Sequence, residues 1–133
     1  DAKYRTLADR EHRAMAGLSM GGGQSWSVGL KHPEVFANIG IFSSGMFGGV
    51  TYKPFDLATE LPELLADPQA FNDNLDLFYI SCGETDPRIT HTKTAVEAMR
   101  ENGAEIHFSA FPGGHEWQPW RKSLHEMVQM LFK

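Results

Sequence analysis

Three side chains of this sequence have the types and spacing needed for nucleophilic catalysis by a serine. The first is Ser19, in the stretch Gly17-Leu18-Ser19-Met20-Gly21, which matches the pattern G-x-S-x-G. In that pattern the serine lies on a tight turn between a strand and a helix, which lifts its hydroxyl clear of the backbone. The motif therefore predicts Ser19 as a nucleophile.

A serine hydroxyl is a weak nucleophile until a histidine accepts its proton, and a carboxylate must orient that histidine. In folds with this serine turn the chain order is serine, acid, histidine, with the last two on loops after later strands. Asp86 follows the third predicted strand and His115 follows the fourth. We therefore predict Asp86 as the acid and His115 as the base.

Each of these residues also has a structural interpretation. The pattern G-x-S-x-G is common by chance, and an aspartate before Pro87 is a typical turn or helix cap. Glu84, in the same turn as Asp86, is the alternative acid. His115 is preferred because it lies in a glycine-rich loop after the last strand, unlike the other histidines, which are His12, His32, His91, His107 and His125.

Composition narrows the classes of function. The chain has 133 residues, 41% of them hydrophobic, a net charge of −5 and no cluster of Lys or Arg, which argues against nucleic acid or a membrane surface as partners. No apolar run approaches the roughly 18 residues of a membrane span. The single cysteine, Cys82, supplies no zinc cluster and is expected to be a buried, inert thiol, so neither a metal nor a cofactor is predicted.

The hydrophobic pattern predicts one domain, residues 1–133, in which strands and helices alternate. Such alternation, with apolar strands, is typical of an α/β fold with a mostly parallel sheet covered by helices on both faces. The predicted strands are 12–17, 38–43, 75–82 and 105–111. The predicted helices are 20–31, 56–73, 89–102 and a C-terminal helix from 117, and residues 1–11 read as the end of another helix.

Two further features concern packing. Gly17 and Gly21 are expected to leave room beside neighbouring strands, and Gly22 and Gly23 to let the next helix lie close to the sheet. The C-terminal helix carries an apolar stripe. Its members are Trp117, Trp120, Leu124, Met127, Val128 and Leu131.

The combination of GLSMGGG, CGETDP and PGGHEWQPWR resembles a known family over nearly the whole chain. It is similar to the esterase D-like α/β-hydrolases, which include bacterial feruloyl esterases and the acetylxylan esterases of carbohydrate esterase family 1. The resemblance implies Ser19 as nucleophile, Asp86 as acid and His115 as base. It also implies that the backbone N–H of Met20 is one donor of the oxyanion hole.

The same resemblance places two segments at the substrate pocket. They are the glycine-rich connection 44–55, which contains Phe47, and the residues after the histidine, which include Trp117 and Trp120. Core packing of both tryptophans is an equally good interpretation, because they begin the apolar stripe of the last helix.

The family has several strands before the serine turn, together with a loop that supplies a second oxyanion N–H, and this sequence has neither. The chain therefore resembles the C-terminal half of an α/β-hydrolase domain, which needs its N-terminal half or another chain to complete the sheet.

The function implied is a serine carboxylesterase that cleaves feruloyl or acetyl esters of plant cell-wall polysaccharide, secreted by a bacterium. The alternatives are an S-formylglutathione hydrolase, a siderophore esterase, or an inactive fragment that requires a partner chain.

Overall fold

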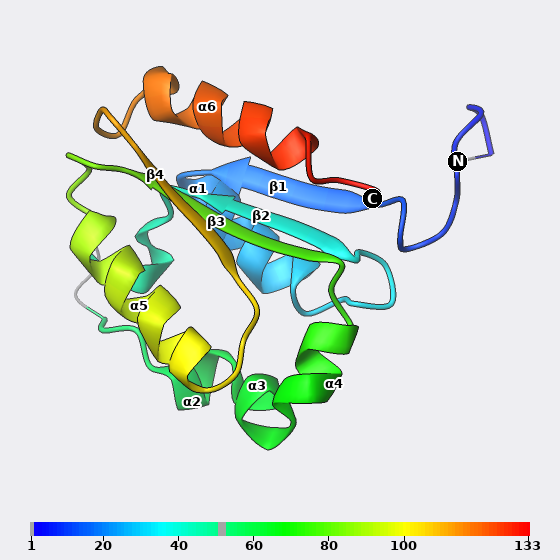
Figure 1. Cartoon of the computed structure of the whole chain (residues 1–133), viewed down its shortest axis with the longest axis horizontal. Helices are drawn as coiled ribbons and strands as arrows, with labels where there is room; N and C mark the ends of the chain where they lie inside the picture. The colour runs from blue at the N-terminus through cyan, green and yellow to red at the C-terminus, as the bar shows by residue number, and fades with distance from the viewer. Residues whose placement is uncertain (1, 51–52) are drawn as a thin grey trace.

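A four-stranded parallel sheet forms the centre of the computed structural model, which describes residues 2–50 and 53–133 (Figure 1). The strands are β1 (Ala14–Leu18), β2 (Asn38–Phe42), β3 (Leu77–Gly83) and β4 (His107–Phe111). They lie side by side in chain order, and all three pairings are parallel. The predicted α/β fold with a parallel sheet is confirmed.

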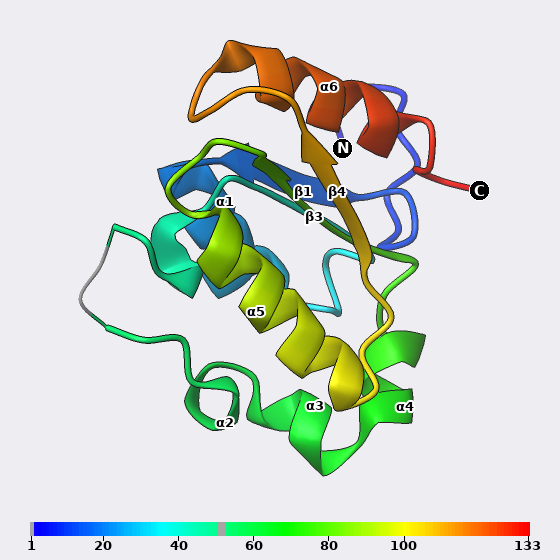
Figure 2. The same cartoon turned by 60° about the vertical axis from the view of Figure 1, so that its left-hand side comes forward.

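Helices cover both faces of this sheet (Figure 2). On one face lies α6 (Trp117–Val128). The other face carries α1 and its continuation η1, the long helix α5, and three short helices. Their bounds are α1 Met20–Gln24, η1 Ser25–Gly29, α2 Leu57–Glu60, α3 Pro62–Ala66, α4 Pro68–Asp73 and α5 Ile89–Glu101, with a 3-10 turn, η2, at Gly45–Phe47.

The main hydrophobic core lies between the sheet and the layer of helices that contains η1, α3, α4 and α5. Every residue of β2 is buried, and Ile39, Ile41 and Ile80 are completely so. Such continuous burial is expected of a parallel strand with helices on both faces. Because the central strands are fixed in this way, the loops at their carboxyl ends start from rigid positions.

The helix predicted for 20–31 is present, but it is not uniformly α-helical. After five residues of α1 the chain continues as the π-helix η1 and ends at Gly29, before His32-Pro33. Gly29 lies against β2 and β1, where an added Cβ would come 2.8 Å from Ile39 Cδ1 and 3.2 Å from Met15 Cβ. The glycine that is unfavourable for a helix thus allows close packing on the sheet.

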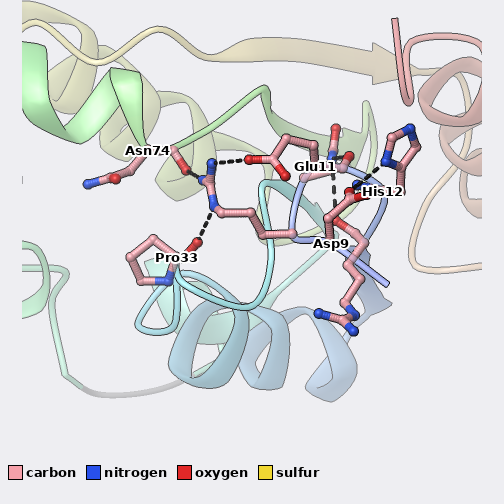
Figure 3. Close-up of polar contacts among 8 residues, drawn as sticks. Asp9, Glu11, His12, Pro33 and Asn74 are labelled. Atoms are coloured by element: carbon pink, nitrogen blue, oxygen red, sulfur yellow. Dashed lines mark hydrogen bonds and ion pairs between the residues drawn. The ribbon is translucent and has the colours of Figure 1, made fainter. Parts of the chain in front are cut away.

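The prediction of a helix end in residues 1–11 is wrong for the described part, because residues 2–13 are turns, bends and irregular chain without a helix. Side-chain hydrogen bonds hold this segment instead (Figure 3). Arg10 donates from Nε to the carbonyl of Pro33 at 2.6 Å and from its guanidinium to the carbonyl of Asn74. Its position before β1 thus ties the start of the sheet to two distant turns.

The apolar stripe of α6 is only partly buried. Met127 is 1% exposed and packs on the sheet, but Trp117, Leu124 and Val128 are 67%, 51% and 49% exposed. The stripe is therefore divided between the sheet and the surface. Leu124 and Val128 are four residues apart, so they lie on a common side of the helix.

A hydrogen bond from Tyr79 fastens α6 to the sheet. Tyr79 on β3 is fully buried, and its hydroxyl donates to Glu126 Oε2 at 2.6 Å. Burial, with the Glu126 carboxylate beside it, raises the pKa of the phenol, which therefore remains a donor at neutral pH. The ring of His107 on β4 stacks on Tyr79 at 5.4 Å.

We expect Tyr79→Phe to lower the free energy of unfolding by about 1 to 2 kcal/mol, because it removes a hydrogen bond to a charged acceptor that water can partly replace. Urea denaturation of the full-length protein measures this loss. Tyr4→Phe is the control, since Tyr4 is 72% exposed. A loss no larger than that of the control would show that the bond does not hold α6.

Candidate functional site

Ser19 occupies a strained backbone conformation between β1 and α1. Its φ is 54° and its ψ is −117°, in a region that residues other than glycine rarely adopt. The Ser19 N–H donates to the carbonyl of Phe42 at 2.8 Å, which extends the pairing of β1 with β2 into the turn. The sheet thus holds the sharp turn that the motif predicts.

A side chain is excluded at one glycine of this turn, Gly17, and would be crowded at another, Gly22. A Cβ on Gly17 would lie 2.2 Å from the carbonyl oxygen of Gly21, and one on Gly22 would lie 3.0 Å from Ser44 Cβ and 3.3 Å from Ile41 Cγ2. The close approach of Gly22 to the sheet is as predicted. The expectation for Gly21 is wrong, because its Cβ would meet no atom within 4 Å.

The structure brings Ser19, His115 and Asp86 together in a continuous chain of hydrogen bonds. Ser19 Oγ lies 2.9 Å from His115 Nε2, and His115 Nδ1 lies 2.8 Å from Asp86 Oδ2. The three residues follow β1, β4 and β3, so they meet at the carboxyl edge of the parallel sheet, where ligands bind in open α/β folds.

Asp86 is the most buried member of this chain, with a side chain that is 0% exposed. Its Oδ1 accepts hydrogen bonds from the backbone N–H of Arg88 at 3.0 Å and from Arg88 Nη1 at 2.9 Å. Burial alone would raise the pKa of the Asp86 carboxyl, but the hydrogen bonds from Arg88 and His115 outweigh it and hold the pKa below its usual value. Asp86 is therefore ionised at neutral pH.

This arrangement assigns the protons of the imidazole. An ionised carboxylate accepts hydrogen bonds but donates none, so Nδ1 of His115 must carry the proton that faces Asp86. In the neutral ring Nε2 is then an acceptor, and it faces the Ser19 hydroxyl. The geometry can transfer a proton from serine to histidine while a nucleophilic oxygen is generated.

The loops that carry Asp86 and His115 are joined directly by backbone hydrogen bonds. The N–H of Glu84 donates to the carbonyl of Phe111 at 2.8 Å, and the N–H of Thr85 donates to that of Gly113 at 3.0 Å. A Cβ on Gly83 would lie 2.4 Å from the Gly114 carbonyl oxygen. Because Gly83 has no side chain, the loop after β4 can approach the turn after β3 closely enough for His115 to reach Asp86.

The backbone N–H of Met20, which the family resemblance implies as an oxyanion donor, follows Ser19 at the first position of α1. The N–H groups of a helix's first turn have no acceptor within the helix. The Met20 side chain is 78% exposed and lines a cavity of about 540 Å³ together with Ser19, Ser44 and Arg88.

The aromatic residues predicted at the pocket have different surroundings. The rings of Trp120 and His115 pack edge to face with their centroids 4.9 Å apart, and the centroids of the Trp117 and Trp120 rings are 5.4 Å apart. Phe47 is instead 2% exposed and packs in the core against Trp26 and Phe55. Its predicted contact with substrate is corrected to core packing, because the connection folds η2 inward. Residues 51–52 of that connection lie outside the described residues.

The two alternative reactive groups lie outside the hydrogen-bonded chain. Glu84 is exposed in the turn after β3. Cys82 is 1% exposed, and burial together with the nearby Asp86 charge raises the pKa of its thiol to about 11, so it is not a thiolate at neutral pH.

Within the described residues, no group of three or more His, Cys, Asp or Glu side chains is arranged to hold a metal ion. In the same part of the chain, none of the helices has the length and apolar character that a bilayer crossing requires.

Comparison with known proteins identifies the family of this chain. A family model described as "Putative esterase" matches residues 1–131. The chain belongs to this esterase family. It is also 34% identical, over 134 residues, to an endo-1,4-beta-xylanase/feruloyl esterase of Xylanibacter ruminicola, an alignment that covers 100% of this chain and 16% of that protein.

Solved structures agree with the fold. A ferulic acid esterase superposes on this esterase-family chain with a TM-score of 0.75 and 26% identity, over 98% of this chain and 55% of its own. An S-formylglutathione hydrolase of Staphylococcus aureus superposes with a TM-score of 0.74 and 18% identity, over 96% of this chain and 54% of its own. The chain thus has an α/β-hydrolase fold and spans about half the length of these structures.

Sequence reasoning missed the roles of Gly83 and Arg88, and, although it placed Trp120 at the pocket, it missed the contact of Trp120 with His115. The role of Gly83 depends on a crossing of two loops far apart in the chain. The contact of Trp120 with His115 had a signal in the sequence. Trp120 comes five residues after His115, in the first turn of α6, which lies close to the loop that contains the histidine. Arg88 had a signal as well, since it comes two residues after the acid, but its side-chain direction is set by the start of α5.

We expect Asp86→Asn in the full-length protein to keep the fold and to lower kcat by up to about 10⁴, because an amide no longer stabilises the required histidine tautomer. Ester hydrolysis at saturating substrate measures the effect. Glu84→Gln is the matched control, since Glu84 is exposed in the same turn. The reverse ranking of the two variants would assign the acid role to Glu84.

Proposed function

We propose that this chain carries the catalytic triad of a serine carboxylesterase, with Ser19 as nucleophile, His115 as base and Asp86 as acid. The supporting observation is the unbroken chain of hydrogen bonds, 2.9 Å from serine to histidine and 2.8 Å from histidine to aspartate. Membership of the esterase family supports the same conclusion.

The proposed reaction has two stages. Ser19 Oγ attacks the ester carbonyl carbon while His115 Nε2 takes the hydroxyl proton, and the Met20 N–H stabilises the oxyanion that forms. The tetrahedral intermediate collapses as His115 returns the proton to the departing alcohol, which leaves an acyl group on Ser19. Water then attacks the acyl-enzyme with His115 again as base, and the acid is released.

We propose feruloyl or acetyl esters of plant cell-wall polysaccharide as the substrates. The relative from Xylanibacter ruminicola and the ferulic acid esterase with similar structure carry names that favour this class. Trp117 is 67% exposed, and its ring packs against Trp120, which in turn packs against His115. Exposed aromatic rings of this kind suit an aryl group or a sugar face. We therefore assign the two tryptophans to the substrate side of His115.

We further propose that the catalytic domain includes chain beyond these residues. The described strand β1 pairs with β2 on one side, so its other edge offers unpaired backbone groups. Leu124 and Val128 of α6 are about half exposed and would be covered by an added helix or strand. A second oxyanion N–H would come from the same added segment.

The proposed substrate class is tested by hydrolysis of methyl ferulate by the full-length protein, with short-chain acyl thioesters and a catecholate siderophore ester as competitors. We expect release of ferulate that Ser19→Ala abolishes, because the nucleophile is removed. Thr94→Ala, which removes an exposed hydroxyl of α5 outside the cavity beside Ser19, is the control. Preference for the thioester would favour an S-formylglutathione hydrolase, and preference for the siderophore ester would favour that esterase.

The need for additional chain is tested with the 133-residue chain alone. We expect its kcat to be at least about 100-fold below that of the full-length protein, because removing one oxyanion donor typically costs about 2.7 to 4 kcal/mol. Size-exclusion chromatography in the same experiment reports association through the open edge. A stable monomer with full turnover would contradict this proposal.

A further inference from the structure

Arg88 lies where it can control the acid of the proposed triad. It stands between the turn that contains Asp86 and the start of α5, and its side chain is 14% exposed. Both of its hydrogen bonds to Asp86, from the backbone N–H and from Nη1, end on the same oxygen, Oδ1. Arg88 therefore binds one carboxylate oxygen, Oδ1, with both its backbone and its side chain.

The two oxygens of Asp86 are consequently divided between two partners. Oδ1 belongs to Arg88 and Oδ2 faces His115 Nδ1. A carboxylate can rotate about its last side-chain torsion, and that torsion has a broad energy profile. The two bonds from Arg88 oppose this rotation, so that Oδ2 stays directed at the imidazole.

Charge supports the same role. Within the described residues, the titratable groups that interact with the Asp86 carboxylate are Arg88, His115 and Cys82, and of these Arg88 alone is a permanent cation. Glu84 in the same turn and Glu116 after the histidine are carboxylates. A carboxylate with a fully buried side chain needs a charged or hydrogen-bonding partner to remain ionised.

We propose that Arg88 is a positioning residue for Asp86: it fixes Oδ1 so that Oδ2 orients His115 toward Ser19. This inference rests on the proposed triad, and it adds a fourth residue to it. Arg88 also lines the cavity beside Ser19, so direct contact with substrate is the competing role that the experiment must separate.

The test compares Arg88→Gln, which removes the charge but keeps an amide donor, with Arg88→Lys, which keeps the charge but loses the planar fork. Both are made in the full-length protein and assayed with p-nitrophenyl acetate, a small ester. We expect kcat to fall by up to about 100-fold in Arg88→Gln and by less in Arg88→Lys, with KM within about twofold of wild type, because a misplaced catalytic group slows the chemical step.

Lys93→Met is the matched control, since it removes one positive charge from an exposed position of the same helix and should leave both constants unchanged. A higher KM with an unchanged kcat in Arg88→Gln would overturn the proposal in favour of substrate contact, and unchanged constants would also overturn it. If Arg88→Gln does not fold, Arg88→Lys decides: a lower kcat at constant KM supports positioning, and an unchanged kcat overturns it.

A second measurement does not depend on activity. Titration of the Asp86 carboxyl by ¹³C NMR should show a higher pKa in Arg88→Gln than in wild type, because the charged hydrogen-bond donor to Oδ1 is lost. An unchanged pKa would overturn the inference even if the wild type proves inactive on esters. Absence of wild-type esterase activity, in contrast, would overturn the proposed function and leave this titration as the decisive result for Arg88.

Discussion

The buried carboxylate of Asp86 is the constraint on which the geometry of the site depends. A charge that is removed from water must receive its hydrogen bonds from the protein, and here the donors are Arg88 and His115. Both must approach within hydrogen-bond distance, which forces the turn after β3 and the loop after β4 into contact. The backbone bonds from Glu84 and Thr85 and the missing side chain of Gly83 make that contact possible.

The strained turn at Ser19 depends on the sheet in a comparable way. A positive φ at a serine is unfavourable, and it persists where surrounding interactions determine it. Pairing of β1 with β2 continues through the Ser19 N–H, while Gly22 lets α1 lie against β2. On the other face, Tyr79 fixes α6, whose first residues carry Trp120 against His115. The side chains of the proposed triad thus lie in short segments anchored by strands and helices on both sides, as precise positioning requires.

The strands and the residues of the candidate site were predictable because both leave local signals. Apolar runs of strand length mark β2 and β3, and Ser19, Asp86 and His115 each follow a strand in a glycine-rich or turn-rich segment. Features that depend on distant contacts were not predictable. The segment before β1 is held by Arg10 on two remote carbonyls, and Phe47 turns into the core because Trp26 lies there.

The same limit applies to α6, whose periodicity indicates an apolar side but not how much sheet is present to cover it. Leu124 and Val128 fit the stripe and yet are exposed, since burial depends on neighbours that a periodic pattern does not describe. Arg88 illustrates the point for chemistry. Its nearness to Asp86 in sequence was visible, but only the start of α5 directs the guanidinium back to the carboxylate.

The order of the strands has a consequence for the synthesis of the protein. Because β1, β2, β3 and β4 are neighbours in chain order, each strand leaves the ribosome next to its partner in the sheet. His115 is the last of the three proposed triad residues to be made, 96 residues after Ser19. In a nascent chain the Ser19 hydroxyl therefore has no imidazole partner until β4 and the loop after it have emerged.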